Sequence, residues 1–335
     1  MSIVMTGGGT GGHLTIIKAV KEQLTNEKLI YVGSTKGQDQ AWFKGDKSFH
    51  STHFLPTQGV VNQGFLGKFK SLFMLAKATI KARRILKENH AKVVFCVGGF
   101  SAAPTAFASK LLGIPLVIHE QNGAIGSLNK LLRPYAKAFI SSYEADSPIK
   151  AYPIKEEFFE KYRIRKEIKT IIFLGGSQGA VAINKLALSL ASTLKDKNIK
   201  IIHQAGERNI EQVKKEYKAL CIEAEVFGFT TKLSDYMAEA DFAIARAGAS
   251  TLWELSAIGC PTLYIPYPYA AGDHQFYNAK FLVEQDVAWI MREDEIDIEE
   301  IISILDMNLE EKSQKLHGII ERDGALQIAN LLKEI

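Results

Sequence analysis

The sequence predicts an α/β protein of two Rossmann-like domains that face a cleft. Three observations support this prediction. Short apolar runs alternate with helical stretches, the apolar runs are continuous, and a strand, a glycine-rich turn and a helix open each half of the chain. Continuous apolar strands separated by helices are typical of parallel sheets that are covered on both faces. A chain of 335 residues is long enough for two such domains.

The first half has apolar runs that predict strands at 2–5, 28–32, 93–97, 115–119 and 137–141. Helices are expected between them, including 12–25, 68–89 and 102–112. A charged stretch at 144–168 predicts a linker, and the pattern then restarts with expected strands at 169–174, 199–203, 224–227, 241–245 and 261–265. We therefore predict domains at 1–153 and 154–311, and a helix at 312–335 that closes the second domain or crosses back to the first.

Composition narrows the class of protein. A net charge of +4 is too small to indicate a nucleic-acid partner unless the charge is clustered. Cys96, Cys221 and Cys260 are widely spaced, which favours a reducing compartment over a disulfide framework or a zinc site. No signal-peptide pattern and no apolar run of about 18 residues is present. The sequence predicts a cytosolic chain that can still lie on a membrane surface.

The first glycine-rich turn, MTGGGTGGH at 5–13, has the spacing of a dinucleotide-binding loop. A dehydrogenase also needs an acidic residue at the end of the second strand to bind the ribose, and the sequence there is GSTK at 33–36. The turn still offers backbone N–H donors to an anion. Because no Walker A lysine and no D-x-D motif occurs, we expect a diphosphate held without a metal or cofactor.

Polar residues follow the turn and a later strand. His13 begins the helix, where a histidine could take a proton from an attacking hydroxyl or bind a phosphate, although taken alone it is more often a solvated side chain. HEQNG at 119–123 closes the strand at 115–119. Ligands of parallel sheets bind at this carboxyl edge.

The second half carries a similar pattern. GGSQGA at 175–180 follows a strand, and RAGASTLWE at 246–254 combines a strand end, a glycine turn and a helix. Glu254 could accept both hydroxyls of a ribose, or it could be a carboxylate that caps the helix. Asp273, His274 and Gln275 could bond sugar hydroxyls, or they could cap a turn.

Together, these motifs resemble the bacterial peptidoglycan N-acetylglucosaminyltransferases, in order from residue 6 to about 280. The matching stretches are GGTGGH, GGFSAAP (98–104), GIPLVIHEQN (113–122), GGSQGA, RAGASTLWE and DHQFYNA (273–279). That family moves N-acetylglucosamine from UDP to undecaprenyl-diphospho-N-acetylmuramoyl-pentapeptide, which converts lipid I to lipid II. The resemblance implies the GT-B glycosyltransferase fold and an inverting, metal-independent transfer to the C4 hydroxyl of the muramoyl sugar.

The resemblance also implies site residues. In the first domain, the positions that would meet donor and acceptor groups are Thr10, Gly11, Gly12 and Asn122, with His13 as the base. In the second domain, Ser177 would face the diphosphate, Thr230 would hold uracil through its backbone, and His274 and Gln275 would contact the sugar. The nucleotide stretch would comprise Gly248, Ala249, Ser250, Thr251, Leu252 and Trp253, with Glu254 on the ribose. Lys155 stands where the family has an arginine, and it keeps the charge without the bidentate fork.

Three other functions stay open. They are a transferase that glycosylates diacylglycerol, a UDP-sugar epimerase on the same fold, and a UDP-sugar-binding regulator without catalysis. The HEQN motif counts against the first, and consumption of an acceptor lipid would exclude the second. The presence of His13, Glu254 and Gln275 disfavours the third.

The stretch at 59–92 is strongly basic. Its cations are Lys68, Lys70, Lys77, Lys81, Arg83, Arg84, Lys87 and Lys92, against the single acid Glu88. Apolar residues recur between them at helical spacing: Phe65, Phe69, Leu72, Phe73, Ala76 and Ile80. An ordinary surface helix that packs on the sheet would also have an apolar face. The excess of cations favours a surface that binds anionic lipid, so we expect peripheral attachment to the inner face of the cytoplasmic membrane.

Overall fold

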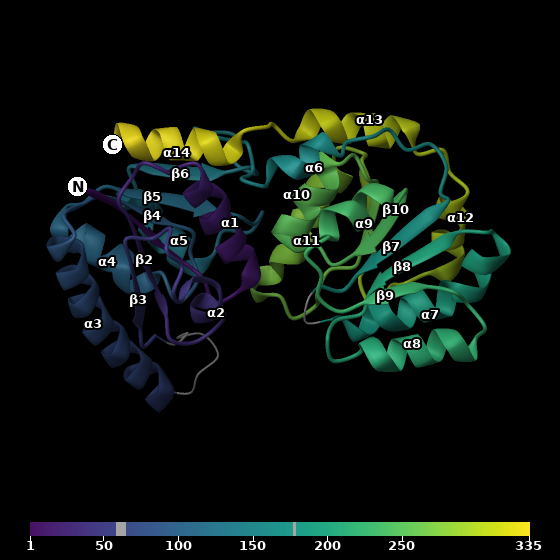
Figure 1. The fold of residues 1–335 in the computed structure, drawn as a ribbon, viewed down its shortest axis with the longest axis horizontal. Helices are drawn as coiled ribbons and strands as arrows, with labels where there is room; N and C mark the ends of the chain where they lie inside the picture. Colours follow the sequence, from purple (N-terminus) through teal and green to yellow (C-terminus); the bar gives the residue numbers. More distant parts are fainter. Residues whose placement is uncertain (58–64, 177–178) are drawn as a thin grey trace. The chain divides into compact units, whose positions relative to one another are not determined.

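The computed structural model describes residues 1–57, 65–176 and 179–335, and of residues 65–70 it describes the backbone alone. The chain divides into two compact units, which are labelled by element in Figure 1. Unit 1 contains residues 1–154 and 321–335, and unit 2 contains residues 155–320. No helix in the described ranges combines the length and the apolar character that a bilayer-crossing segment needs.

Unit 1 contains a parallel sheet of six strands in the order β3-β2-β1-β4-β5-β6. The strands are β1 (Ser2–Thr6), β2 (Leu29–Ser34), β3 (Ser51–Leu55), β4 (Ala91–Cys96), β5 (Leu116–Glu120) and β6 (Ala138–Ser141). The helices are α1 (Gly11–Glu22), α2 (Asp39–Phe43), α3 (Phe65–Glu88), α4 (Ala103–Leu112), α5 (Ser127–Leu132) and α14 (Gly324–Glu334). One face of the sheet packs on α3 and α4 through a core that includes Val4, Ala82 and Val94. Helices α1 and α14 contact each other.

Unit 2 has a second parallel sheet of six strands, in the order β12-β11-β10-β7-β8-β9. The strands are β7 (Thr170–Leu174), β8 (Lys200–Gln204), β9 (Glu225–Phe227), β10 (Phe242–Ala245), β11 (Thr262–Tyr264) and β12 (Ala288–Ile290). The helices are α6 (Glu156–Glu160), α7 (Val181–Asp196), α8 (Ile210–Ala219), α9 (Leu233–Glu239), α10 (Ala249–Ala257), α11 (His274–Val283), α12 (Ile298–Leu305) and α13 (Glu310–Ile319).

The two units share one topology. Numbered within its own unit, each sheet has the order third, second, first, fourth, fifth and sixth strand, which is the order of a Rossmann fold. The predicted duplication is therefore confirmed, and every predicted strand is present. Two further strands, β3 and β12, were not predicted, and both lie at sheet edges. β3 is half-buried and starts with polar residues, and β12 is only three residues long, so neither forms a continuous apolar run.

The end of the chain differs from the single helix expected at 312–335. The structure has two helices, α13 and α14, and Asp323 between them has a φ of 63°. Helix α14 belongs to unit 1. A Cβ at Gly324 would lie 2.5 Å from the carbonyl oxygen of Ala151, so glycine permits this close packing. The prediction of one helix is wrong because the apolar periodicity on either side hides the break.

Candidate functional site

In unit 2, the strand order reverses between β7 and β10, which are neighbours in the sheet. Leu174 pairs with Ala245, and the N–H of Arg246 donates to the carbonyl oxygen of Leu174 at 3.1 Å. The segments that follow the two strands, which begin at residues 175 and 246, therefore start side by side. Ligands of open parallel sheets bind at this kind of reversal. The two glycine-containing motifs of the second half thus meet at one edge.

The start of α10 has the properties of an anion site. Its N-cap, Gly248, has a φ of −66°, which any residue can adopt, and a Cβ there would meet no atom within 4 Å. Neither the backbone nor the packing of the described chain requires glycine at 248. Like most helices in the described part of the chain, α10 has no capping side chain, and it also has no acid in its first turn. Its first N–H groups are suited to an anion that approaches the backbone closely.

Glu254 lies on α10, which packs against α6. Burial raises the pKa of the Glu254 carboxyl to about 7, although nearby Lys155 opposes the rise and Glu157 adds to it. Lys155 is the N-cap of α6, and its Nζ lies 3.0 Å from Oε1 of Glu157. The structure therefore brings two predicted site residues, Lys155 and Glu254, near each other. A desolvated carboxylate gains strongly from two hydroxyl donors such as those of a ribose.

Arg246 and Asn278, which were not predicted as site residues, hold the backbone before α10 in place. The guanidinium of Arg246 donates to the carbonyl oxygens of Ile265 and Pro266, each at 3.0 Å, and pairs with Glu293. The amide of Asn278 donates to the carbonyl oxygen of Ala247 at 3.0 Å. These bonds fix the turn before α10. Their signal in the sequence was the position of both residues inside motifs that also carry predicted ligand contacts.

The remaining predicted positions of unit 2 lie on turns. Oε1 of Gln275 accepts the N–H of Tyr267 at 2.9 Å, which leaves the NH2 of its amide as a donor. Nδ1 of His274 lies 3.0 Å from the carbonyl oxygen of Ala271. The hydroxyl of Thr230 accepts the N–H of Lys232 at 3.0 Å, close to the carboxyl end of β9. Ser177 lies outside the described residues.

In unit 1, the corresponding reversal lies between β1 and β4. The N–H of Val97 donates to the carbonyl oxygen of Thr6 at 3.0 Å, so the turns at 7–10 and 97–101 start together. Gly99 has a φ of 78°, and a Cβ there would lie 2.6 Å from the carbonyl oxygen of Gly8. The glycines of the two turns thus allow the turns to touch. Thr10, Gly11 and Gly12 lead from this contact into α1.

His13 is held on both sides of its ring. Nδ1 lies 2.7 Å from the hydroxyl oxygen of Thr10, and Nε2 lies 2.6 Å from the side-chain nitrogen of Gln121. An amide nitrogen only donates, so in this arrangement Nε2 accepts, and the neutral ring carries its proton on Nδ1. Gln121 was not among the predicted site residues, although it belongs to the HEQN motif.

The other residues of HEQN have separate roles. Oε1 of buried Glu120 accepts the N–H of Asn122 at 3.1 Å, and Oε2 accepts the N–H of Gly126 and the amide of Asn129, each at 2.9 Å. Glu120 therefore sets the position of Asn122. His119 is fully buried, and burial lowers its pKa to about 3, with nearby His13 adding to the effect. His119 therefore stays neutral at pH 7 and out of contact with solvent.

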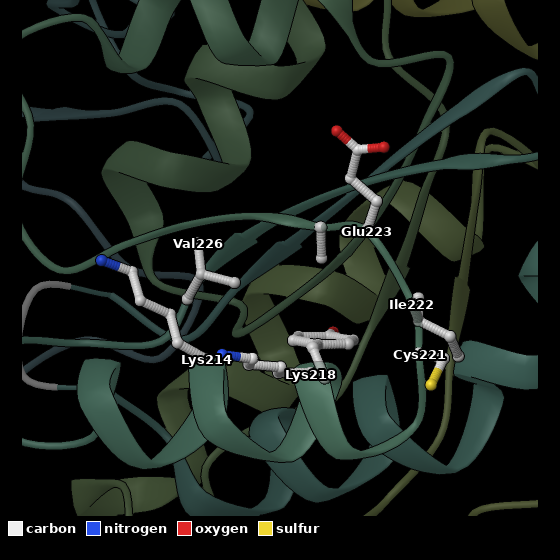
Figure 2. Close-up of a pocket in the computed structure, with 8 residues that line it drawn as sticks. Lys214, Lys218, Cys221, Ile222, Glu223 and Val226 are labelled. Carbon is white, nitrogen blue, oxygen red and sulfur yellow. The ribbon is translucent and has the colours of Figure 1, made fainter.

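A hollow of about 340 Å³ lies away from these residues. Figure 2 shows its lining, which includes Lys214 and Lys218 of α8 and Cys221 just beyond the helix. The hollow opens beside the amino end of β9, whereas the turns of the candidate site follow the carboxyl ends of β7 and β10. It is therefore separate from the candidate site.

Comparisons with known proteins agree on the family. The glycosyltransferase family 28 N-terminal domain matches residues 3–141, and the glycosyltransferase family 28 C-terminal domain matches residues 170–331. A curated relative from Sulfurovum sp. (strain NBC37-1) is 68% identical over 333 residues, which cover 99% of this chain and 98% of the relative. Its name is UDP-N-acetylglucosamine–N-acetylmuramyl-(pentapeptide) pyrophosphoryl-undecaprenol N-acetylglucosamine transferase. A relative from Wolinella succinogenes with the same name is 48% identical and covers 99% of both chains.

Solved structures show the same fold. The crystal structure of Acinetobacter baumannii MurG matches with a TM-score of 0.80 and 28% identity, over 100% of this chain and 99% of that chain. The glycosyltransferase SnogD from Streptomyces nogalater matches with a TM-score of 0.68 and 15% identity, over 100% of this chain and 99% of that chain. At that identity, the likeness to SnogD concerns the fold alone.

Proposed function

The chain belongs to glycosyltransferase family 28, and on this basis we propose that it converts lipid I to lipid II. It is a GT-B transferase that moves N-acetylglucosamine from UDP-N-acetylglucosamine to the C4 hydroxyl of undecaprenyl-diphospho-N-acetylmuramoyl-pentapeptide. The observation that carries this proposal is the start of α10. Open space at Gly248, a helix start without a capping side chain and the desolvated Glu254 fit the diphosphate and ribose of a nucleotide sugar.

The proposed reaction is a single in-line displacement. The C4 oxygen of the acceptor bonds to the anomeric carbon of the donor, and the bond from that carbon to the diphosphate breaks. UDP leaves with the bonding electrons, so negative charge grows on the diphosphate. N–H groups at the start of α10 would stabilise that charge, which is the largest requirement of such a step. Ser177 would add to this stabilisation.

The acceptor hydroxyl must lose its proton as it attacks. We assign this proton to Nε2 of His13, which in the structure accepts from Gln121. A hydroxyl that replaces Gln121 as the donor gives its proton to the same nitrogen. The bond between Nδ1 and the hydroxyl of Thr10 then orients the imidazolium, much as a third residue orients a catalytic histidine elsewhere.

The remaining predicted contacts complete the proposal. Gly11, Gly12 and Asn122 would meet the acceptor and the donor sugar from unit 1. In unit 2, Thr230 would bind uracil, Lys155 would face the donor, and His274 and Gln275 would bind the sugar hydroxyls. The nucleotide would lie along the stretch Gly248, Ala249, Ser250, Thr251, Leu252 and Trp253.

We also propose that unit 1 attaches to the anionic inner face of the cytoplasmic membrane. The side chains of Leu72, Phe73 and Ile80 on α3 are 58%, 61% and 69% exposed. Exposed Lys77, Lys81 and Arg84 follow at steps of four and three residues, so they share this side of the helix. An apolar row flanked by cations suits an anionic lipid surface. The predicted contributions of Phe65, Lys68, Phe69 and Lys70 concern side chains outside the described set.

The test of the proposed function is acceptor consumption. UDP-N-acetylglucosamine labelled in the sugar is incubated with the protein and either lipid I or diacylglycerol, with and without a chelator. The proposal expects label in the lipid I fraction alone, at the same rate with chelator. Labelled diacylglycerol would indicate the related transferase. An epimerised donor without labelled lipid, or binding without turnover, would overturn the proposal.

A further inference from the structure

The buried carboxylate of Asp39 hydrogen-bonds to the backbone of the first glycine turn. Asp39, the first residue of α2, is fully buried. Its Oδ2 accepts the N–H of Gly9 at 2.6 Å, and its Oδ1 accepts the N–H of Ser34 at 2.9 Å. The hydroxyl of Tyr31 lies 3.0 Å from Oδ1 and 2.9 Å from the carbonyl oxygen of Gly7. Burial, and then the nearby Asp39, raise the pKa of Tyr31 well above its usual value, so this hydroxyl remains a donor.

Glycines make the room that this carboxylate needs. A Cβ at Gly8 would lie 2.4 Å from Oδ1 of Asp39, and a Cβ at Gly33 would lie 2.6 Å from the same oxygen. Gly8 has no left-handed φ, so the carboxylate, and not the backbone conformation, is what excludes a side chain there. The first glycine turn and the end of β2 therefore both pack against the Asp39 carboxylate, and both need glycine at the point of contact.

The position of Asp39 has two consequences for the turn. The N–H of Gly9 is engaged by a carboxylate, so it is not one of the groups that the turn offers to a phosphate. Gly9 also immediately precedes Thr10, whose hydroxyl bonds the ring of His13. A chain of contacts thus runs from Asp39 through Gly9 and Thr10 to His13 and Gln121.

We propose that Asp39 is a positioning residue for the acceptor half of the reaction, because it fixes the glycine turn that orients Thr10 and His13. This inference rests on the proposed function for its kinetic consequence. A displacement of about 1 Å at a reacting group is enough to slow a reaction by about a hundredfold. Because Asp39 belongs to unit 1, its effect falls on the acceptor and on the proton transfer, and not on nucleotide binding.

The test compares Asp39→Asn with a matched control, Asp46→Asn. Asp46 lies in the same segment and accepts bonds from Lys21 and Ser48, away from the turn. Asp39→Asn is expected to lower kcat/KM for lipid I by about tenfold to a hundredfold. The KM for UDP-N-acetylglucosamine should stay within about twofold. Asp46→Asn should leave both constants unchanged. An unchanged kcat/KM for lipid I in folded Asp39→Asn, or a loss that comes from a raised KM for UDP-N-acetylglucosamine, would overturn the inference.

A second readout does not depend on turnover. The ¹⁵N shifts of the His13 ring report which nitrogen carries the proton, and they are expected to change in Asp39→Asn but not in Asp46→Asn. Unchanged shifts would overturn the inference even if the wild-type protein transferred no sugar, whereas missing transfer alone would overturn only the proposed function. If Asp39→Asn does not fold, Tyr31→Phe keeps the carboxylate and its two N–H donors. Tyr31→Phe should then give a smaller loss in the same direction, and no loss would count against the inference.

Discussion

The side-chain nitrogen of Gln121 lies 2.6 Å from Nε2 of His13, although the two residues follow different strands of the unit 1 sheet. His13 follows β1 and Gln121 follows β5, with β4 between these strands. In this arrangement the amide donates to Nε2, which is the nitrogen that we propose accepts the proton of the acceptor hydroxyl. The proposed base therefore depends on a residue that no local pattern around His13 reveals.

Replacing His13 tests its assignment as the base. His13→Ala should lower kcat by about a hundredfold or more, with smaller changes in either KM, because base catalysis acts in the transition state. Steady-state kinetics with lipid I measures the change. His50→Ala, at an exposed histidine of the same unit, serves as the control. A change confined to the KM for lipid I would make His13 a binding residue and place the base elsewhere.

Changing Gln121 should move the pH profile. In Gln121→Glu, a carboxylate replaces the amide next to the ring and raises the pKa of His13. The base must be unprotonated, so the acidic limb of kcat/KM for lipid I should shift to higher pH. The measurement is the pH–rate profile of both proteins. A limb at the same pH in the variant would show that His13 does not control this limb.

Glu254 should make donor use pH-dependent. Its pKa is raised to about 7, so the free protein loses the carboxylate as pH falls through 7. We expect kcat/KM for UDP-N-acetylglucosamine to fall over the same range. Glu254→Gln should flatten this dependence and raise the donor KM at pH 8 by roughly 10- to 100-fold, since a charge-assisted bond contributes about 1.5–3 kcal/mol. Glu284→Gln, at an exposed glutamate, is the control. An unchanged donor KM in Glu254→Gln would show that Glu254 does not bind the donor.

The same carboxylate should lower the stability of the free protein at alkaline pH. The pKa of Glu254 is about 7 in the folded chain against 4.5 for the ordinary group. The stability linked to its proton is therefore present below about 4.5 and lost as pH rises through 7. Glu254→Gln should raise the unfolding temperature at pH 8, by the equivalent of at most about 3 kcal/mol, and by much less at pH 5. Equal gains at both pH values in thermal unfolding scans would contradict this.

Membrane attachment should depend on the cations near α3. In liposome flotation, binding is expected to require anionic lipid and to weaken with salt. Binding should fall when Lys68, Lys70, Arg83 and Arg84 become Ser. The control replaces as many exposed cations of unit 2, namely Lys185, Lys214, Lys215 and Lys218. Equal binding to anionic and neutral vesicles, or an equal fall in the α3 variant and the unit 2 control, would count against attachment through unit 1.

The sequence was informative where the signal is local. Continuous apolar runs predict the buried strands, and glycines after β1 and β7 mark the turns because those positions need bare backbone. Asp39 was missed because nothing near it in sequence shows that the chain folds beneath residues 7–9. Gln121 was missed for a similar reason, since its contact with His13 exists only when β5 is placed two strands from β1. The pattern of α14 likewise indicates a buried face but cannot tell which unit buries it.

The proposed reaction moves one sugar, with inversion, to one hydroxyl of lipid I. The most direct measurement is NMR of the disaccharide released by mild acid from the lipid product made by this protein. We expect N-acetylglucosamine joined in the β configuration to the C4 oxygen of the muramoyl sugar. An α linkage, or a linkage to another hydroxyl, would contradict it.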